Sequence, residues 1–209
     1  MGEMTDVRLA LAQAKAALAE AGADAGEAER AALAEAEKAL GSAKIKHVVF
    51  QNGMQPAKDF IGIQVDQINR YYRNAERTDE DVQSGLKAGS HNDLQRILIR
   101  FDGLREELGP GRVIRATLEL YETEAPKADG AIVALFRLKK AWTPNAGTWL
   151  NADQRKKTAW EKPGASGPAD AEEKPESQVV FDGQANLWRS WDVTACVRDI
   201  LADLTPNHG

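Results

Sequence analysis

Two stretches in which apolar residues recur at every second position, 96–101 and 114–121, constrain the fold of this chain most strongly. The first places these residues on one face: Ile97, Ile99 and Phe101. Its other positions fall on the opposite face: Arg96, Leu98 and Arg100. The second stretch follows the same period: Ile114, Ala116, Leu118 and Leu120. Successive side chains of a strand point to opposite faces, so this period predicts strands with one buried face. Glycine and proline between the stretches supply turn residues, and we expect two antiparallel strands of a β-sandwich.

The first 44 residues differ from the rest, because alanine, glutamate, leucine and lysine dominate them. Apolar residues spaced by three and four predict a helix over 5–21 and another over 27–40, with a glycine-rich break at 22–26. We therefore expect an N-terminal helical hairpin. Its alanine-rich stripe buries little area, so it predicts a spacer or docking arm, 1–44, ahead of a β-sandwich domain, 45–209.

The remaining sequence predicts a mainly β, antiparallel, jelly-roll-like sandwich. Further strands are expected at six places: 46–51, 60–66 with a continuation to 72, 84–89, 131–138, 178–181 and 187–193. The segment 151–177 is rich in charge, proline and glycine, and it predicts a long, partly mobile loop. Thr194 is expected to cap a short C-terminal helix.

Charge and composition exclude some classes of function. The formal net charge of −5 disfavours nucleic-acid binding, which needs a basic surface. No apolar run is long enough to span a bilayer, so no membrane span is expected. Cys196 is the only cysteine, so no internal disulfide forms. No signal peptide is visible at the start of the chain.

Several spaced motifs resemble the DNRLRE-type β-sandwich domain of bacterial secreted and surface proteins. The resemblance covers about 48–209 and is carried by these segments: Arg96–Asp102, Ile114–Tyr121, Trp142–Trp149, Trp191–Thr194 and Pro206–Gly209. It implies a non-catalytic module, in some members polysaccharide-binding, that is extracellular or on the cell surface. No cofactor is implied.

The chain departs from the family pattern in two places. The Asn-Tyr-Gly motif of the family is missing near Tyr71 and Tyr72. In the family, a final core strand follows the position of Gly209, so the sheet is expected to have an open C-terminal edge. Such an edge exposes unpaired backbone groups. Either the strand lies outside this sequence, or a protein partner or second chain supplies it.

Aromatic residues outside the family motifs are the candidates for carbohydrate contact, because their rings stack on sugar rings. They are Trp160, which lies in the polar loop, and Trp188, Tyr71 and Tyr72. Packing against the sandwich is an equal alternative for each. Arg70 and Arg155 are candidates for pairing with acidic sugars. Tryptophans inside the motifs are expected to pack in the core instead: Trp142, Trp149 and Trp191.

Catalytic and metal motifs are not apparent. The sequence contains no nucleophile elbow, P-loop or Rossmann fingerprint, and its histidines lack metal-ligand spacing. The acidic run at 78–81 is a conceivable calcium site, but it lacks the usual spacing and glycine, so we interpret it as solvated loop charge.

Two non-enzymatic functions are favoured. The leading hypothesis is a carbohydrate-binding or surface-attachment module of a larger exported protein. The alternative is a structural or assembly domain that engages a protein partner through the helical arm and the open sheet edge. A hydrolase is the least favoured, because nothing assembles a nucleophile and base.

Overall fold

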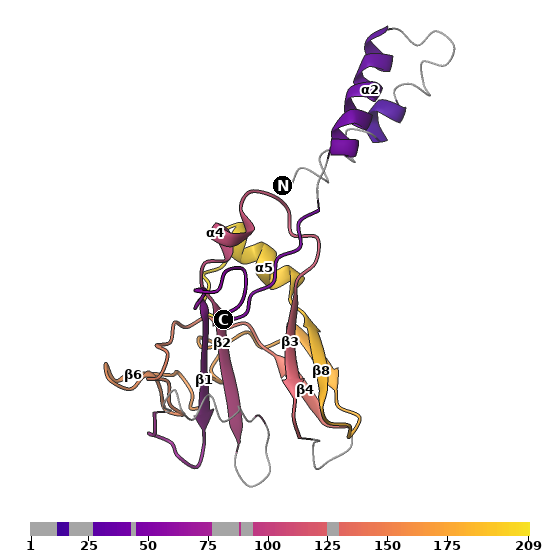
Figure 1. Cartoon of the computed structure of the whole chain (residues 1–209). Coiled ribbons are helices and arrows are strands. Elements are labelled where there is room, and N and C mark those ends of the chain that lie inside the picture. The colour runs from indigo at the N-terminus through magenta and orange to yellow at the C-terminus, as the bar shows by residue number, and fades with distance from the viewer. Residues whose placement is uncertain (1–11, 17–26, 43–44, 77–87, 89–93, 125–129) are drawn as a thin grey trace. The chain divides into compact units, whose positions relative to one another are not determined.

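The computed structural model describes residues 12–16, 27–42, 45–76, 88, 94–124 and 130–209 (Figure 1). Within them the chain consists mainly of strands in antiparallel sheets, with few helices, as the sequence predicted. The helices are α2 (Glu27–Ser42), α4 (Leu104–Leu108) and α5 (Thr194–Leu201). The strands are β1 (Ile63–Asn69), β2 (Gln95–Phe101), β3 (Thr117–Glu122), β4 (Ile132–Leu135), β5 (Asn151–Asp153), β6 (Thr158–Ala159), β7 (Ser177–Val180) and β8 (Leu187–Asp192). The predicted segment 84–89 lies almost wholly outside the described residues.

The chain forms two compact units. One comprises Met1–Val49 and Arg105–Ile114, and the other comprises Phe50–Leu104 and Arg115–Gly209. The first unit contains α2, which confirms the second predicted helix, and residues 12–16 are also helical. The turn between the two predicted helices lies outside the described residues.

The strand predicted over 46–51 is wrong. Residues 45–50 have no regular structure, and Gln51 pairs only with Gln55 across a tight turn. In the first unit, the Lys46 ammonium donates to the carbonyl of Glu107 over 2.8 Å. The valines of this run therefore follow an irregular path, because β propensity alone does not supply a partner strand.

In the second unit, β1 and β2 form an antiparallel pair in which Val65 lies opposite Ile99 (Figure 1). The more buried face of β2 is the one with Leu98 and the two arginines. Arg96 stacks over the ring of Trp149, and Arg100 stacks over Trp142. The isoleucine face is half-buried. The expectation of a single buried face is therefore wrong: tryptophans cover the arginine stems on the second face.

The two predicted alternating stretches do not pair with each other. Instead β3 pairs with β8, and β4 pairs with β7, both antiparallel. The inward phase predicted for β3 is confirmed, since Leu118 and Leu120 are half-buried while Thr117 and Glu119 are exposed. Residue Ile114 precedes β3 and is exposed, so the strand begins later than the alternation suggests.

The hydrophobic core lies beside the arginine face of β2 and consists mostly of tryptophan. Its buried members include Ile68, Leu98, Leu138, Trp142, Trp149 and Trp160. The predicted core packing of Trp142, Trp149 and Trp191 is confirmed. Trp191 lies elsewhere, on β8, where its indole donates to the carbonyl of Val133 on β4 over 3.0 Å.

The segment 151–177 folds onto this core rather than projecting as the expected mobile loop. It begins with a short hairpin, β5 and β6. Further on, the buried carboxylate of Asp170 accepts hydrogen bonds from three backbone amides: Glu161, Lys162 and Gly167. Charged residues in this segment therefore serve as internal partners of the backbone, which composition alone does not distinguish from solvation.

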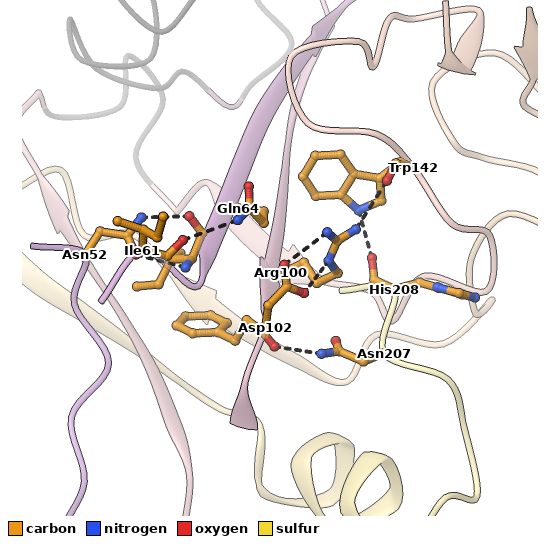
Figure 2. Close-up of polar contacts among 10 residues, drawn as sticks. Asn52, Ile61, Gln64, Arg100, Asp102, Trp142, Asn207 and His208 are labelled. Atoms are coloured by element: carbon orange, nitrogen blue, oxygen red, sulfur yellow. Dashed lines mark hydrogen bonds and ion pairs between the residues drawn. The ribbon is translucent and has the colours of Figure 1, made fainter. Parts of the chain in front are cut away.

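Polar side chains hold the ends of β1 and β2 (Figure 2). The carboxamide of Asn52 accepts from the amide of Ile63 over 2.9 Å and donates to its carbonyl over 2.7 Å. It thereby occupies the outer edge of β1 as a neighbouring strand would. On β2, Arg100 forms two hydrogen bonds with the carboxylate of Asp102 and a third with the carbonyl of Trp142.

The C-terminal helix α5 begins at Thr194, as predicted, but Thr194 does not cap it. The threonine hydroxyl accepts from the amide of Ala116 over 2.9 Å. The amide of Thr194 itself donates to the carboxylate of Asp192 over 2.8 Å, and the threonine hydroxyl, followed by this amide, lowers the pKa of Asp192. The threonine thus joins the start of α5 to the residue preceding β3.

Candidate functional site

Two aromatic rings, Trp188 and Tyr121, lie exposed on the outward face of the β3–β8 pair. Trp188 is 63% exposed and Tyr121 is 48% exposed. They lie directly opposite each other in the strand register, and their ring centroids are 5.4 Å apart. A large aromatic side chain gains most when it is buried, so an exposed pair of this kind is a binding-surface candidate.

Strand geometry explains why both rings face outward. Along β8, the exposed residues Trp188 and Ser190 alternate with the buried residues Arg189 and Trp191. Because side chains alternate between faces, anchoring these neighbours inside directs Trp188 outside. The pairing with β3 then places Tyr121 on the same face.

An ion-pair network around the buried side chain of Arg189 fixes this end of β8. The Arg189 guanidinium contacts the carboxylate of Glu122 and that of Asp182, each over 2.7 Å, and stacks over the ring of Phe181. The hydrogen bond from Arg189 lowers the pKa of Asp182. Arg189 thus joins the end of β3 to the turn before β8, directly beneath the aromatic pair.

The geometry of the pair limits what it can bind. The two ring planes are inclined by 66°, so they do not form a flat platform. One ring can stack on a sugar while the other borders it from the side. Along the same face, Glu119 lies opposite Ser190, and both are exposed. These polar groups are suited to hydrogen bonds with sugar hydroxyls, and the carboxylate disfavours an acidic sugar there.

Four of the predicted residues gather in a different region. Tyr71 and Tyr72 are exposed in the turn after β1, where the side chain of Asn69 accepts from both of their amides. Their rings meet edge to face, with centroids 4.9 Å apart. Arg70 is exposed beside them.

Arg155 approaches this turn from the β5–β6 hairpin. Its guanidinium donates to the carboxylate of Glu76 over 3.4 Å and to the carbonyl of Asn145 over 2.8 Å. The amide of Leu150 also donates to the carbonyl of Arg73. The fold therefore brings the two tyrosines and two arginines into one region, apart from Trp188, which lies on another strand pair.

Trp160 does not belong to either exposed group. It is only 4% exposed, and its indole donates to the carbonyl of Thr148 over 2.9 Å. The packing alternative therefore applies, and the expectation that its ring stands free in a polar loop is corrected. The β5–β6 hairpin carries Trp160 into the core, where its ring has no face open to a sugar.

Tyr121 is the residue that the sequence reasoning missed. The signal was present, because Tyr121 continues the outward positions of an alternating run, after Arg115, Thr117 and Glu119. An aromatic residue at the polar phase of a strand breaks the alternation. What the sequence lacks is the register, which alone places Tyr121 opposite Trp188.

Within the described ranges, no group of three or more histidine, cysteine or acidic side chains is placed to hold a metal ion. The acidic run 78–81 lies outside those ranges. Among the described helices, none combines the length and apolar character required to cross a bilayer.

No family model, curated protein or solved structure matches the chain.

Proposed function

We propose that this chain is a non-catalytic carbohydrate-binding or surface-attachment module of a larger exported protein, of the DNRLRE type. The observation that carries the proposal is the exposed pair of Trp188 and Tyr121 on the outer face of a strand pair. Tryptophan faces bind sugar rings by stacking and release of weakly held water. Glu119 and Ser190 on the same face can form hydrogen bonds with sugar hydroxyls.

The proposal includes a jelly-roll-like sandwich as the support for this face. Two observations favour it: Leu118 and Leu120 face inward from β3, and the indole of Trp191 reaches from β8 to the carbonyl of Val133 on β4. Burial between two layers accounts for the alternation of exposed and inward residues along both strands.

The geometry favours a particular ligand class. Because the rings of Trp188 and Tyr121 are steeply inclined, the pair suits single glycan chains better than the flat face of a crystalline polymer. Glu119 on that face favours neutral sugars. The turn with Tyr71, Tyr72 and Arg70 is a second, cationic candidate, to which acidic sugars would bind.

The test is affinity pull-down with matched polysaccharide preparations. We expect retention on an amorphous, acid-swollen neutral polymer and weaker retention on its crystalline form. The substitution Trp188→Ala is expected to abolish retention, and Tyr71→Ala is expected to leave it unchanged. Loss of binding to acidic polymers in Tyr71→Ala alone would move the site to the turn. Equal retention of wild type and Trp188→Ala on every neutral polymer contradicts the assignment.

A second candidate function is structural: assembly with a protein partner through an open sheet edge or the helical arm. The observation that favours the edge is that, among the described strands, β2 pairs only with β1. The helical arm stays a prediction. Analytical ultracentrifugation of the full chain tests self-assembly, and a monomer at all concentrations excludes it.

A further inference from the structure

Five exposed cationic side chains lie in two loops of the second unit. The turn after β1 carries Arg70 and Arg73, and the turn between β5 and β6 carries Arg155, Lys156 and Lys157. We call these five residues the basic surface. The whole chain has a formal net charge of −5, so this surface opposes the overall charge of the protein. Like charges that lie on one surface repel one another, and a bound anion relieves that repulsion.

Two contacts join the loops that carry these charges. The amide of Leu150, which precedes β5, donates to the carbonyl of Arg73 over 3.3 Å. At the turn of the hairpin, the guanidinium of Arg155 donates to the carboxylate of Glu76 over 3.4 Å. One contact therefore holds the base of the hairpin against the turn, and the other holds its tip. The two loops form one continuous surface.

Carboxylates neutralise only part of the basic surface. Glu76 forms an ion pair with Arg155, and Asp153 forms one with the ammonium of Lys156 over 3.4 Å. Three cations of the basic surface form no ion pair with any residue that the structure describes: Arg70, Arg73 and Lys157. Their donors are therefore available to an anionic ligand.

The turn after β1 is held by local hydrogen bonds. The side-chain oxygen of Asn69 accepts from the amides of Tyr71 and Tyr72 over 2.7 and 3.1 Å. The amide of Arg70 donates to the carbonyl of Leu94 over 3.0 Å and so continues the pairing of β1 with β2. These bonds fix the backbone before a ligand arrives, which lowers the entropy lost on binding.

The aromatic rings in this turn indicate what the anionic groups are attached to. Tyr71 is 74% exposed and Tyr72 is 62% exposed, and both lie between Arg70 and Arg73 in the sequence. A small inorganic anion would use the cations alone. A ligand with sugar rings would also cover the exposed tyrosine rings, so the combination favours an acidic polysaccharide.

The type of cation indicates the anionic group. Two of the three cations without an ion pair are arginines, and the planar guanidinium matches a carboxylate with two parallel hydrogen bonds. The net charge of −5 disfavours nucleic acid, whose dense phosphates require a broadly basic partner. Sugar carboxylates, as in uronic acids, therefore fit this surface best.

We propose that the basic surface and the two tyrosines bind an acidic polysaccharide whose sugar rings carry carboxylates. This inference rests on the proposed function, because it assigns a second class of glycan to the same module. It extends the candidate turn to the β5–β6 hairpin. Arg70 and Arg73 pair with carboxylates, the tyrosine rings contact the sugar rings, and Lys157 adds a third charge from the hairpin.

Two forms of one polymer test the proposal on the full chain. The probe is polygalacturonate in calcium-free buffer, and the control is its fully methyl-esterified form, which keeps the sugar rings and loses the charge. By titration calorimetry, we expect the ester to bind at least about tenfold more weakly. Raising the salt from about 0.1 M to about 1 M shortens the Debye length from about 10 Å to about 3 Å, so we expect it to weaken polygalacturonate binding.

Charge removal locates the binding. The triple variant Arg70→Gln, Arg73→Gln, Lys157→Asn removes the three cations without ion pairs, and asparagine suits the φ of 54° at Lys157. We expect about tenfold weaker binding, or about 1.4 kcal/mol over three exposed charge pairs. The control is Lys58→Gln, which removes an exposed charge from the loop before β1 and is expected to leave binding unchanged.

A measurement on the wild-type chain keeps the test decisive if the triple variant fails to fold. In NMR titration with a galacturonate oligosaccharide, we expect the amide signals of Tyr71, Tyr72 and Lys156 to shift, whereas that of Lys58 stays in place. Shifts confined to other residues show that the ligand binds elsewhere and overturn the proposal.

This site and the Trp188–Tyr121 pair fail in different ways. Trp188→Ala is expected to keep polygalacturonate binding, and the triple variant is expected to keep retention on a neutral polymer. Loss of polygalacturonate binding in the triple variant supports the basic surface even if no neutral polymer is retained by the wild type. Neutral binding lost in Trp188→Ala, without any binding of polygalacturonate, supports the aromatic pair and overturns this inference.

Three further results overturn it. Equal affinity for polygalacturonate and its methyl ester shows that the carboxylates are not recognised. Equal affinity for polyacrylate shows that charge alone suffices and that the sugar rings make no contact. Equal or tighter binding of an oligothymidylate assigns the surface to single-stranded nucleic acid instead.

Discussion

The indole nitrogen of Trp142 donates a hydrogen bond to the backbone carbonyl of His208 over 2.8 Å. It joins a core tryptophan to residues 207–209, which we call the C-terminal tail. Because Arg100 stacks over the same ring and bonds the carbonyl of Trp142, the tail, the core and β2 meet at one side chain (Figure 2). The position of the tail against β2 and Leu138 therefore depends on this indole.

Trp142→Phe is expected to loosen the tail and lower the free energy of unfolding by about 1–3 kcal/mol. The phenyl ring keeps most of the apolar packing but leaves the His208 carbonyl without its donor. Urea denaturation measures the loss, and hydrogen exchange at Leu138 reports the release of Gly209. The control is Trp188→Phe on the exposed face, which is expected to change stability by less than about 0.5 kcal/mol. Equal losses in the two variants contradict this role of the indole.

Two tryptophan truncations should separate packing from binding. Trp160→Ala removes a buried ring and its bond to Thr148, and we expect a loss of about 3–5 kcal/mol in unfolding free energy. Trp188→Ala removes an exposed ring, so its cost is expected to stay near or below about 1 kcal/mol. Thermal or urea unfolding of both variants measures these two losses in stability. A Trp160→Ala protein as stable as Trp188→Ala would mean that Trp160 is not a core residue.

Trp160 and Trp188 show which structural features local sequence patterns can predict and which they cannot. The alternating periods of β2 and β3 predict strands at nearly the observed positions, because a strand's own residues determine its period. The burial of Trp160 cannot be predicted in this way, because it depends on a hairpin and on charged residues that fold inward around the ring. Likewise, Trp188 is recognisable as a candidate, but its partner Tyr121 emerges only with the strand register.

The same limit applies to residues 207–209. The side-chain amide of Asn207 donates to the carbonyl of Phe101 at the end of β2, and the carbonyl of Gly209 accepts from the amide of Leu138. Such contacts link residues distant in sequence, and no local period encodes them. For the run 46–51, conversely, strong β propensity was misleading because none of the described strands pairs with it.

Asn52→Ala is expected to destabilise the β1–β2 pair by about 1 kcal/mol. The substitution removes both hydrogen bonds between the Asn52 carboxamide and the backbone of Ile63, and water replaces them because the site is exposed. Urea denaturation measures the change. Gln64→Ala is the matched control, since its single bond to Ile61 is long, at 3.3 Å, and a smaller loss is expected. An Asn52→Ala loss no greater than that of Gln64→Ala contradicts the edge role.

Stability is expected to fall as the pH drops below about 6.5, the usual pKa of histidine, because of His208. Burial, and then the charge of Arg100, lower the pKa of His208 in the folded protein. Between that lowered pKa and about 6.5, the unfolded chain binds the proton more strongly, so acid favours unfolding there. Urea denaturation at successive pH values measures the slope, and NMR titration measures the pKa. His208→Gln keeps the backbone carbonyl that Trp142 bonds and should remove this part of the slope. A His208 pKa at or above 6.5, or an unchanged slope in His208→Gln, contradicts the prediction.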